Sequence, residues 1–201
     1  MESGQRVEDM GQYNLRGGIM GSLSNRLSYK LYAAANFYRG MSFFANNYTE
    51  GSTSRFIVVA DNCTAYTLGG NIDFASSDRL SIRASANINA YHMDTYQKAG
   101  GLPLYDVALG AKWNLAPKWD LGLTGTLLGQ RYFYVWVASD GQLRTDKVDP
   151  ALDLGARLAW HHSRFITFWL EGSNLGNSRL YPYNHYRSVG VGAMAGVILS
   201  F

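Results

Sequence analysis

The sequence predicts an all-β chain of about nine antiparallel strands that follow one another as an up-and-down meander. Apolar and polar residues alternate along most of the 201 residues, and a side-chain period of two is typical of a β-strand with two different faces. The composition agrees, with 22 glycines, only 4 prolines and 14% aromatic residues. No helical period competes over a comparable length.

The stretch SSDRLSIRASANINAY, residues 76–91, alternates most strictly. Its apolar parity consists of Leu80, Ile82, Ala84, Ala86, Ile88 and Ala90, and its polar parity of Ser81, Arg83, Ser85, Asn87 and Asn89. In a soluble sandwich, the apolar face of such a strand packs on a core. In a membrane barrel, the apolar face contacts lipid and the polar face lines the interior.

Nine segments share this alternation. They cover residues 13–23, 27–38, 64–74, 76–91, 104–115, 119–136, 151–161, 165–174 and 189–201. In each segment the apolar residues occupy alternate positions. One example from each segment, in chain order, gives Leu15, Leu31, Leu68, Ile82, Leu109, Leu123, Leu154, Phe168 and Val197. The segment 165–174 is the least regular, because Phe165 and Trp169 fall on its polar parity. About ten residues at roughly 3.3 Å each, tilted near 40°, rise about 25 Å, the height of the apolar band of a membrane barrel.

The connections between these segments alternate in length. Short turns are expected at residues 24–26, 76–79, 116–118 and 161–164. Longer and more polar links are expected at residues 39–55, 97–103, 137–150 and 175–188. Tight periplasmic turns and long extracellular loops are typical of outer-membrane barrels, so this sorting favours a membrane barrel over a soluble sandwich.

Aromatic residues gather near the ends of the segments. Those toward the short turns are Phe74, Trp113, Trp119, Trp160 and Phe201, and those toward the long loops are Phe37, Tyr91, Tyr132, Phe133, Tyr134 and Trp136. Two belts of this kind are expected where aromatic rings meet lipid headgroups.

Ten charged residues occupy the polar parity of the segments. They are Arg16, Lys30, Asp73, Arg83, Asp106, Lys112, Asp120, Asp153, Arg157 and Glu171. Ten charges in a dry core would be prohibitively costly. We therefore expect them to face the lumen of the barrel.

Composition excludes several other classes of protein. A formal net charge of +3 without a basic cluster argues against nucleic-acid binding. The single cysteine, Cys63, excludes a disulfide framework. No apolar run reaches the length of about 18 residues that a membrane-spanning helix needs, and the first ten residues do not resemble a signal peptide.

The motifs that could take part in catalysis or ligand binding have simpler interpretations, so the sequence predicts no catalytic, cofactor or metal site. The glycine run 190–196 imitates a dinucleotide-binding loop but lacks a following helix. His161 and His162 are adjacent, so on a strand they point to opposite faces. An arrangement of His92, Asp94 and His185 at the loop end would suit a barrel enzyme, but lone loop histidines are far more common. The candidate ligand-contact loop is LYPYNHY, with Tyr181, Tyr183, His185 and Tyr186. Interfacial anchoring explains its tyrosines equally well.

The end of the chain resembles a known family of membrane barrels. The final alternating strand stops at Phe201, which is similar to the C-terminal signal read by the barrel-assembly machinery. Before it, Asn174, Leu175 and Asn177 precede a tyrosine-rich loop. This pattern resembles the last hairpin of TonB-dependent receptors and related Bacteroidetes-type barrels, and the resemblance covers residues 104–201. It implies a non-catalytic barrel for nutrient uptake in the bacterial outer membrane. The implied partners are lipid, the assembly machinery and, through upstream parts, a TonB-type energy-transducing complex.

Strand counting predicts that the chain is the C-terminal part of a larger barrel. With Phe201 at the periplasmic end, the first of nine strands would enter from outside, so residues 1–12 are expected to be an extracellular loop remnant. Residues 13–201 would be a single barrel segment, with export directed by upstream sequence. We expect an open sheet in which residues 13–23 do not pair with 189–201. The alternatives are a small closed barrel of the OmpA or OmpW kind and an outer-membrane barrel enzyme.

Overall fold

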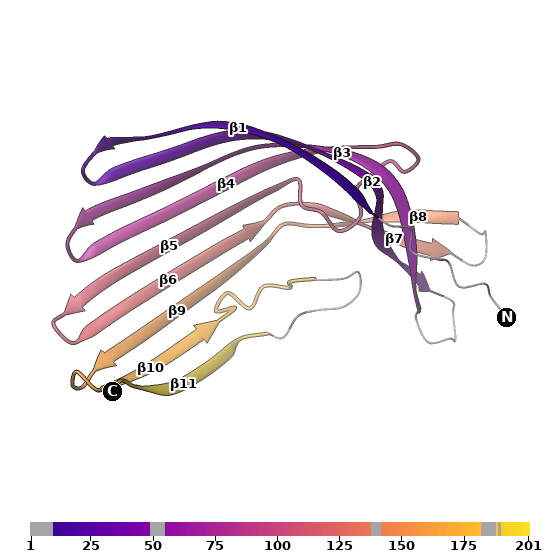
Figure 1. Ribbon diagram of the computed structural model, residues 1–201. Coiled ribbons are helices and arrows are strands. Elements are labelled where there is room, and N and C mark those ends of the chain that lie inside the picture. Colours follow the sequence, from indigo (N-terminus) through magenta and orange to yellow (C-terminus); the bar gives the residue numbers. More distant parts are fainter. Residues whose placement is uncertain (1–9, 49–54, 138–141, 182–187, 189) are drawn as a thin grey trace.

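The computed structural model describes residues 10–48, 55–137, 142–181, 188 and 190–201, and these form one sheet of eleven strands (Figure 1). The strands are β1 (Gly11–Ser24), β2 (Leu27–Tyr48), β3 (Arg55–Ser77), β4 (Leu80–Met93), β5 (Tyr105–Ala116), β6 (Trp119–Leu128), β7 (Arg131–Val137), β8 (Gln142–Val148), β9 (Ala151–His161), β10 (Ile166–Ser173) and β11 (Gly192–Leu199). The all-β prediction is confirmed. Among the described residues, no helix is long and apolar enough to span a membrane.

Nine of these strands form the predicted antiparallel meander. They lie in the order β1-β2-β3-β4-β5-β6-β9-β10-β11, each paired antiparallel with the next. The predicted segment 119–136 was wrong as a single strand, because Gly129 and Gln130 interrupt it and the chain leaves the meander as the hairpin β7–β8. β6 therefore pairs with β9, and β7 pairs in parallel with Ala45–Tyr48 of β2.

Short turns lie at one end of the sheet, and longer connections lie at the other. The short turns after β1, β3, β5 and β9 lie together on the left of Figure 1, and β11 runs toward the same end. At each of the first three turns a bulge shifts the register, as between Ser22 and Ser24. The links that follow β4 and β10, and the β7–β8 hairpin, lie at the opposite end, which we call the long-loop end.

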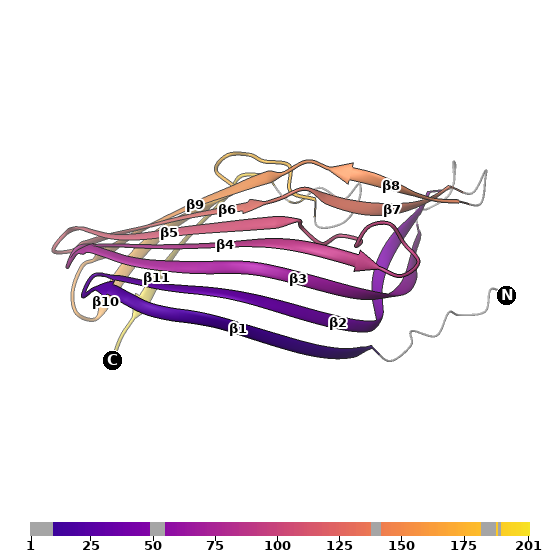
Figure 2. The same cartoon turned by 90° about the horizontal axis from the view of Figure 1, so that it is seen from above.

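The link expected at residues 39–55 is largely strand. β2 and β3 continue past a bulge between Tyr38 and Met41, where Gly40 has a φ of 68°, and remain paired as far as Asn47 and Arg55. Figure 2 shows both strands bending away from the long sheet toward β7. A left-handed φ suits glycine, which has no Cβ to collide with the backbone.

A small apolar core fills the space beneath this bend. It contains Met41, Phe43, Ala45, Val59, Cys63, Ala65, Met93, Ala99 and Tyr134, each 9% exposed or less. The rings of Phe43, Tyr96 and Tyr134 pack against one another at centroid distances of 5.1–5.5 Å. Tyr134 and Phe133, expected in an aromatic belt, are instead buried, because β7 turns in under β2.

The first and last strands of the sheet do not meet. In the described part of the chain, β1 pairs only with β2 and β11 only with β10. The sheet is therefore open and curved, with β1 at the top and β11 at the bottom of Figure 1. This agrees with the expectation that residues 13–23 do not pair with 189–201.

Candidate functional site

Strand register separates the sheet into two chemically different faces. Residues directly opposite each other in an antiparallel pair share a face. One row crosses five strands as Leu80, Trp113, Leu121, Leu158 and Leu170. The side chains of this apolar face are open to the surroundings, with Trp113 at 47% exposure and Leu170 at 57%. An apolar face of this extent indicates contact with a membrane or another apolar surface.

Aromatic rings of the apolar face gather near the short turns. Trp160 stacks between Trp119 and Phe168, at ring-centroid distances of 5.9 and 5.6 Å. His162 packs edge-on against Trp160 at 5.1 Å. These rings form a belt at the position that the sequence predicts for the short-turn end.

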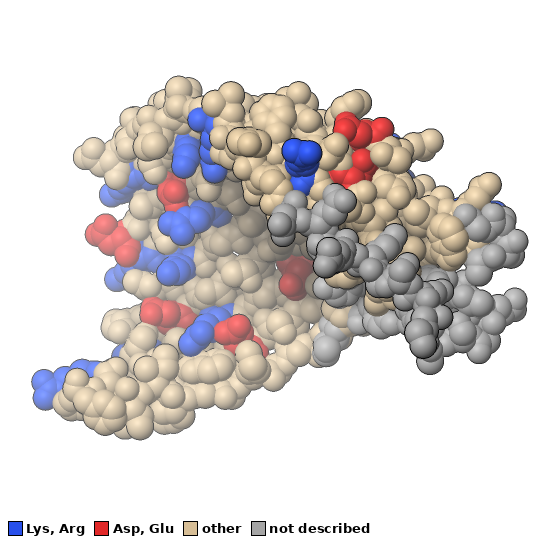
Figure 3. Space-filling view, turned by 45° about the vertical axis from the view of Figure 1, so that its right-hand side comes forward, with Lys and Arg blue, Asp and Glu red and all other residues tan. Residues whose placement is uncertain are grey.

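All ten charged residues expected to face a lumen lie on the opposite face, which we call the polar face. The register runs, for example, from Ser81 through Lys112 and Gly122 to Arg157, which lies opposite Glu171. Figure 3 shows Lys, Arg, Asp and Glu side chains inside a hollow of the molecule. Near the short turns, this hollow has a volume of about 630 Å³, lined by side chains that include Asp73, Arg83 and Lys112.

Charged and amide groups on the polar face bind one another across strands. Arg83 donates from Nε to Asp73 at 2.5 Å, and Arg157 donates to Glu171 at 3.3 Å. Asn87 donates to Asp106 at 2.8 Å. The side chains of the two ion pairs are a third or more exposed, so each ion pair contributes little to stability.

Two arginine side chains on the polar face lie over aromatic rings. The Arg16 guanidinium lies 3.7 Å from the Tyr32 ring centroid, and that of Arg157 lies 4.5 Å from a Trp169 ring. Trp169 covers Gly196 on the neighbouring strand, where an added Cβ would lie 2.6 Å from its ring. This arrangement explains why an aromatic residue interrupts the alternation of β10: the Trp169 ring lies on the polar face and fills the space beside Gly196.

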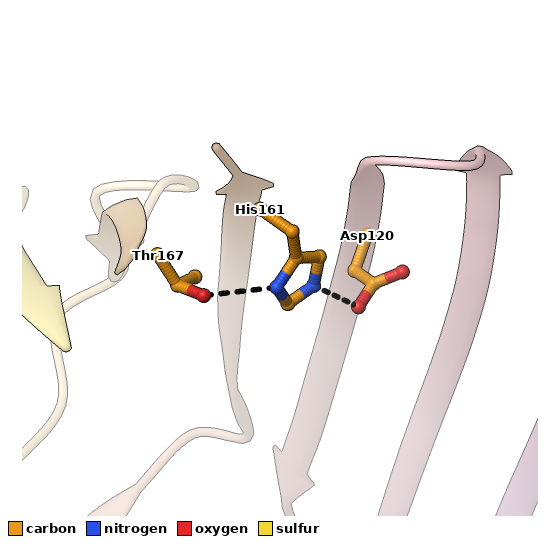
Figure 4. Close-up of polar contacts among 3 residues, drawn as sticks. All are labelled: Asp120, His161 and Thr167. Atoms are coloured by element: carbon orange, nitrogen blue, oxygen red, sulfur yellow. Dashed lines mark hydrogen bonds and ion pairs between the residues drawn. The ribbon is translucent and has the colours of Figure 1, made fainter. Parts of the chain in front are cut away.

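A three-residue bridge joins β6, β9 and β10 near the short turns (Figure 4). His161 Nε2 lies 2.7 Å from Asp120 Oδ2, and His161 Nδ1 lies 2.9 Å from Thr167 Oγ1. A neutral imidazole can donate to the carboxylate and accept from the hydroxyl. Sequence reasoning identified Asp120 as a lumen charge but missed its partners, because only the register places His161 opposite Thr167.

The asparagine motif after β10 forms a turn. Asn174 and Asn177 both have a φ of 47°, which asparagine tolerates better than most residues. The Asn174 side chain donates to the Ser178 carbonyl and accepts from the Ser178 N–H, and the Asn174 N–H donates to Asp153 Oδ1 at 3.1 Å. The motif thus ties the end of β10 to β9.

The long-loop end is organised by a buried carboxylate. Asp61 accepts hydrogen bonds from the backbone N–H groups of Asn62, Thr95 and Tyr96 at 2.8–3.0 Å. Burial raises the pKa of Asp61, but hydrogen bonds from the three N–H groups and from the Thr95 side chain together outweigh burial and leave the pKa below its ordinary value. The Tyr134 hydroxyl holds the same loop by donating to the Lys98 carbonyl and accepting from the Lys98 N–H.

The candidate ligand-contact loop is described only in part. Tyr181 contributes its carbonyl oxygen to the buried Arg131 guanidinium at 2.7 Å, whereas Tyr183, His185 and Tyr186 lie outside the described residues. Tyr181 also lines a hollow of about 720 Å³ between the loop and residues 146–152. Sequence reasoning missed Arg131, which lay within a segment taken as a single strand.

Other candidate residues are dispersed. His92 lies opposite Thr64, Asp94 accepts from the Asn62 amide at 2.9 Å, and Phe201 is exposed at the end of the chain. His161 and His162 face opposite sides of the sheet, since one binds Asp120 and the other packs on Trp160. In the described residues, no three His, Cys, Asp or Glu side chains are grouped closely enough to hold a metal ion.

No family model and no curated protein matches this chain. Solved structures of much larger proteins do match its fold. The ferripyoverdine receptor of the outer membrane of Pseudomonas aeruginosa is 13% identical, with a TM-score of 0.71 over 98% of this chain and 28% of its own. The siderophore receptor PirA from Acinetobacter baumannii is 13% identical, with a TM-score of 0.72 over 96% of this chain and 32% of its own. The copper transporter OprC is 11% identical, with a TM-score of 0.71 over 98% of this chain and 33% of its own. The chain therefore shares its fold with part of each of these proteins and spans about three-tenths of their length.

Proposed function

We propose that this chain is the C-terminal part of an outer-membrane transport barrel similar to a TonB-dependent receptor, serving nutrient uptake without catalysis. The observation that carries the proposal is the separation of the sheet into an apolar face and a charged polar face. That separation follows the register across the nine strands of the meander. The fold of the chain matches the ferripyoverdine receptor over 98% of this chain and 28% of the receptor. Lipid would cover the apolar face, and the polar face would line the transport path.

Open sheet edges support a place within a larger barrel. β1 and β11 each pair on one side in the described residues, and unpaired backbone groups inside a bilayer cost several kcal/mol each. Further strands of the same barrel would satisfy them. The matched receptors, of which this chain spans 28–33%, are large enough to supply such strands.

The proposed partners of the protein and its assignment to a narrower group of receptors both rest on the sequence pattern. In this proposal Phe201 is read by the barrel-assembly machinery, and a TonB-type complex acts through parts of the protein beyond this sequence. The Bacteroidetes-type membership rests on the Asn174-Leu175-x-Asn177 pattern. Tyr181, Tyr183, His185 and Tyr186 are the proposed ligand-contact residues. The ten polar-face charges are the proposed lining of the lumen.

A fluorescence experiment tests which face meets lipid. The chain is refolded into phospholipid vesicles as two single-tryptophan variants, one keeping Trp113 on the apolar face and the other keeping Trp169 on the polar face. Bromine atoms on the lipid acyl chains should quench Trp113 strongly and spare Trp169. Equal quenching of the two, in chains shown to be folded by protection of the Cys63 thiol, would contradict the proposal.

Transport itself is tested by growth. A strain lacking the whole gene should grow more slowly than its parent on at least one scarce iron, copper or carbon source, and restoring the gene should restore growth. Equal growth on every source would leave no support for uptake.

A further inference from the structure

Buried polar atoms without partners gather around one segment at the long-loop end. Four buried side-chain N or O atoms of the described residues lack a hydrogen-bond partner: Asn46 Oδ1, Arg131 Nε, Arg131 Nη2 and Ser188 Oγ. Three of these four belong to residues held by Leu180 and Tyr181. Arg131 donates to the Tyr181 carbonyl, and the Ser188 N–H donates to the Leu180 carbonyl at 2.7 Å.

The geometry of Arg131 leaves one particular edge of its guanidinium free. Nη1 is committed to Tyr181, whereas Nε and Nη2 are the two nitrogen atoms whose N–H groups point in the same direction. That edge is the fork that binds both oxygens of a carboxylate through two parallel hydrogen bonds. Arg131 is only 5% exposed, so water does not solvate the fork freely.

Among the described residues, no acidic side chain forms an ion pair with Arg131. Its closest aromatic contact is the Phe133 ring, 5.7 Å away. Asp146 shares this face of the β7–β8 hairpin, in the position opposite Phe133. An uncompensated buried charge is strongly destabilising, so a site of this kind requires an anion.

We propose that the Arg131 fork is a binding site for the carboxylate of a small soluble ligand. The hollow of about 720 Å³ lies next to the site, because it is lined by Val148, which is opposite Arg131, and by Tyr181, whose carbonyl binds Arg131.

The test follows the Nε–H resonance of Arg131 by NMR in the chain refolded in detergent micelles, with the resonance assigned from its loss in Arg131→Lys. Sodium acetate is the probe, and sodium chloride at equal ionic strength is the reference. Acetate should shift the resonance saturably, whereas chloride should not. Backbone amides of Tyr181 and Ser188 should shift with the same midpoint, and in Arg131→Lys that midpoint should weaken by about tenfold or more.

Two variants separate this proposal from its rivals. Lys147→Gln removes a nearby exposed cation and should leave the acetate midpoint unchanged; a tenfold weakening would mean that general positive charge, not the fork, binds the probe. Asp146→Asn should also bind acetate as the wild type does. Acetate binding by Asp146→Asn but not by the wild type would show that a carboxylate of the chain itself occupies the fork. Absence of acetate binding in both the wild type and Asp146→Asn would overturn the proposal. Because the readout is local to Arg131, it does not depend on the transport function.

Discussion

Tyr32 on β2 donates a hydrogen bond to Asn87 on β4 across the full width of the intervening strand, directly above Gly69. Gly69 permits this contact because it has no side chain: an added Cβ would lie 2.2 Å from Asn87 Oδ1 and 2.6 Å from the Tyr32 ring. Asn87 in turn donates to Asp106 on β5, so one polar chain joins β2, β4 and β5 on the polar face and passes over β3. A glycine in a strand often marks such a close approach.

Gly69→Ala should therefore destabilise the sheet by about 1–3 kcal/mol, the usual cost of overpacking. Urea unfolding of the chain in detergent micelles, followed by tryptophan fluorescence, measures the change. Gly110→Ala is the matched control, because an added Cβ there meets nothing within 4 Å. Equal losses in the two variants would show that the Tyr32–Asn87 contact is irrelevant to stability.

Leu123→Arg and Thr124→Arg place the same charge on opposite faces of β6. If lipid covers the apolar face, the first should lose about 2–4 kcal/mol of stability in phospholipid vesicles, as expected for arginine near the bilayer midplane. The second should lose much less, because its side chain enters the polar hollow. Urea titration in vesicles gives both values, and a larger loss for Thr124→Arg would reverse the assignment of the faces.

Cys63 should react slowly with maleimide while the protein is folded. The side chain is 2% exposed, and burial, followed by the charges of Asp61 and Asp94, raises the pKa of the thiol and so lowers its thiolate fraction. Alkylation at pH 7 should be at least about tenfold slower than that of a Ser24→Cys, Cys63→Ala variant, whose thiol lies at an exposed turn. Denaturant should abolish the difference. Rapid reaction of folded Cys63 would mean that the core beneath the β2–β3 bend is open.

Asp61 should make the loop after β4 sensitive to acid. Its pKa is lowered in the folded protein, so the carboxylate stabilises the loop fully above the unfolded pKa of about 3.9. That stabilisation is lost as the pH falls through the lower folded value. At pH 7, Asp61→Asn should speed hydrogen exchange at the Thr95 and Tyr96 amides, with a cost of about 1–3 kcal/mol for the lost acceptor. Asp94→Asn should have a much smaller effect, because the Asp94 contact with Asn62 is exposed and an amide oxygen can still accept from the Asn62 side chain.

Much of the candidate site could be predicted because a strand exposes alternate residues to opposite faces. The period alone assigns Leu123 to one face and Lys112 to the other, without knowledge of which strands are neighbours. It could not reveal that His161 bridges Asp120 and Thr167, or that Arg131 binds the Tyr181 carbonyl. Those contacts join residues 6 to 50 positions apart, and they depend on register and on the path of a loop.

The sequence by itself determined the all-β class, the strands of the meander, the sorting of short turns and long connections, and the division of side chains between two faces. These properties are local, since period, length and turn residues are read within about ten positions. Only the tertiary structure decided that β2 and β3 continue past Gly40, that β7 leaves the meander to pair with β2, and that the sheet stays open between β1 and β11. Backbone hydrogen bonds between strands are available to almost any sequence, so the choice of partner depends on how the whole chain packs.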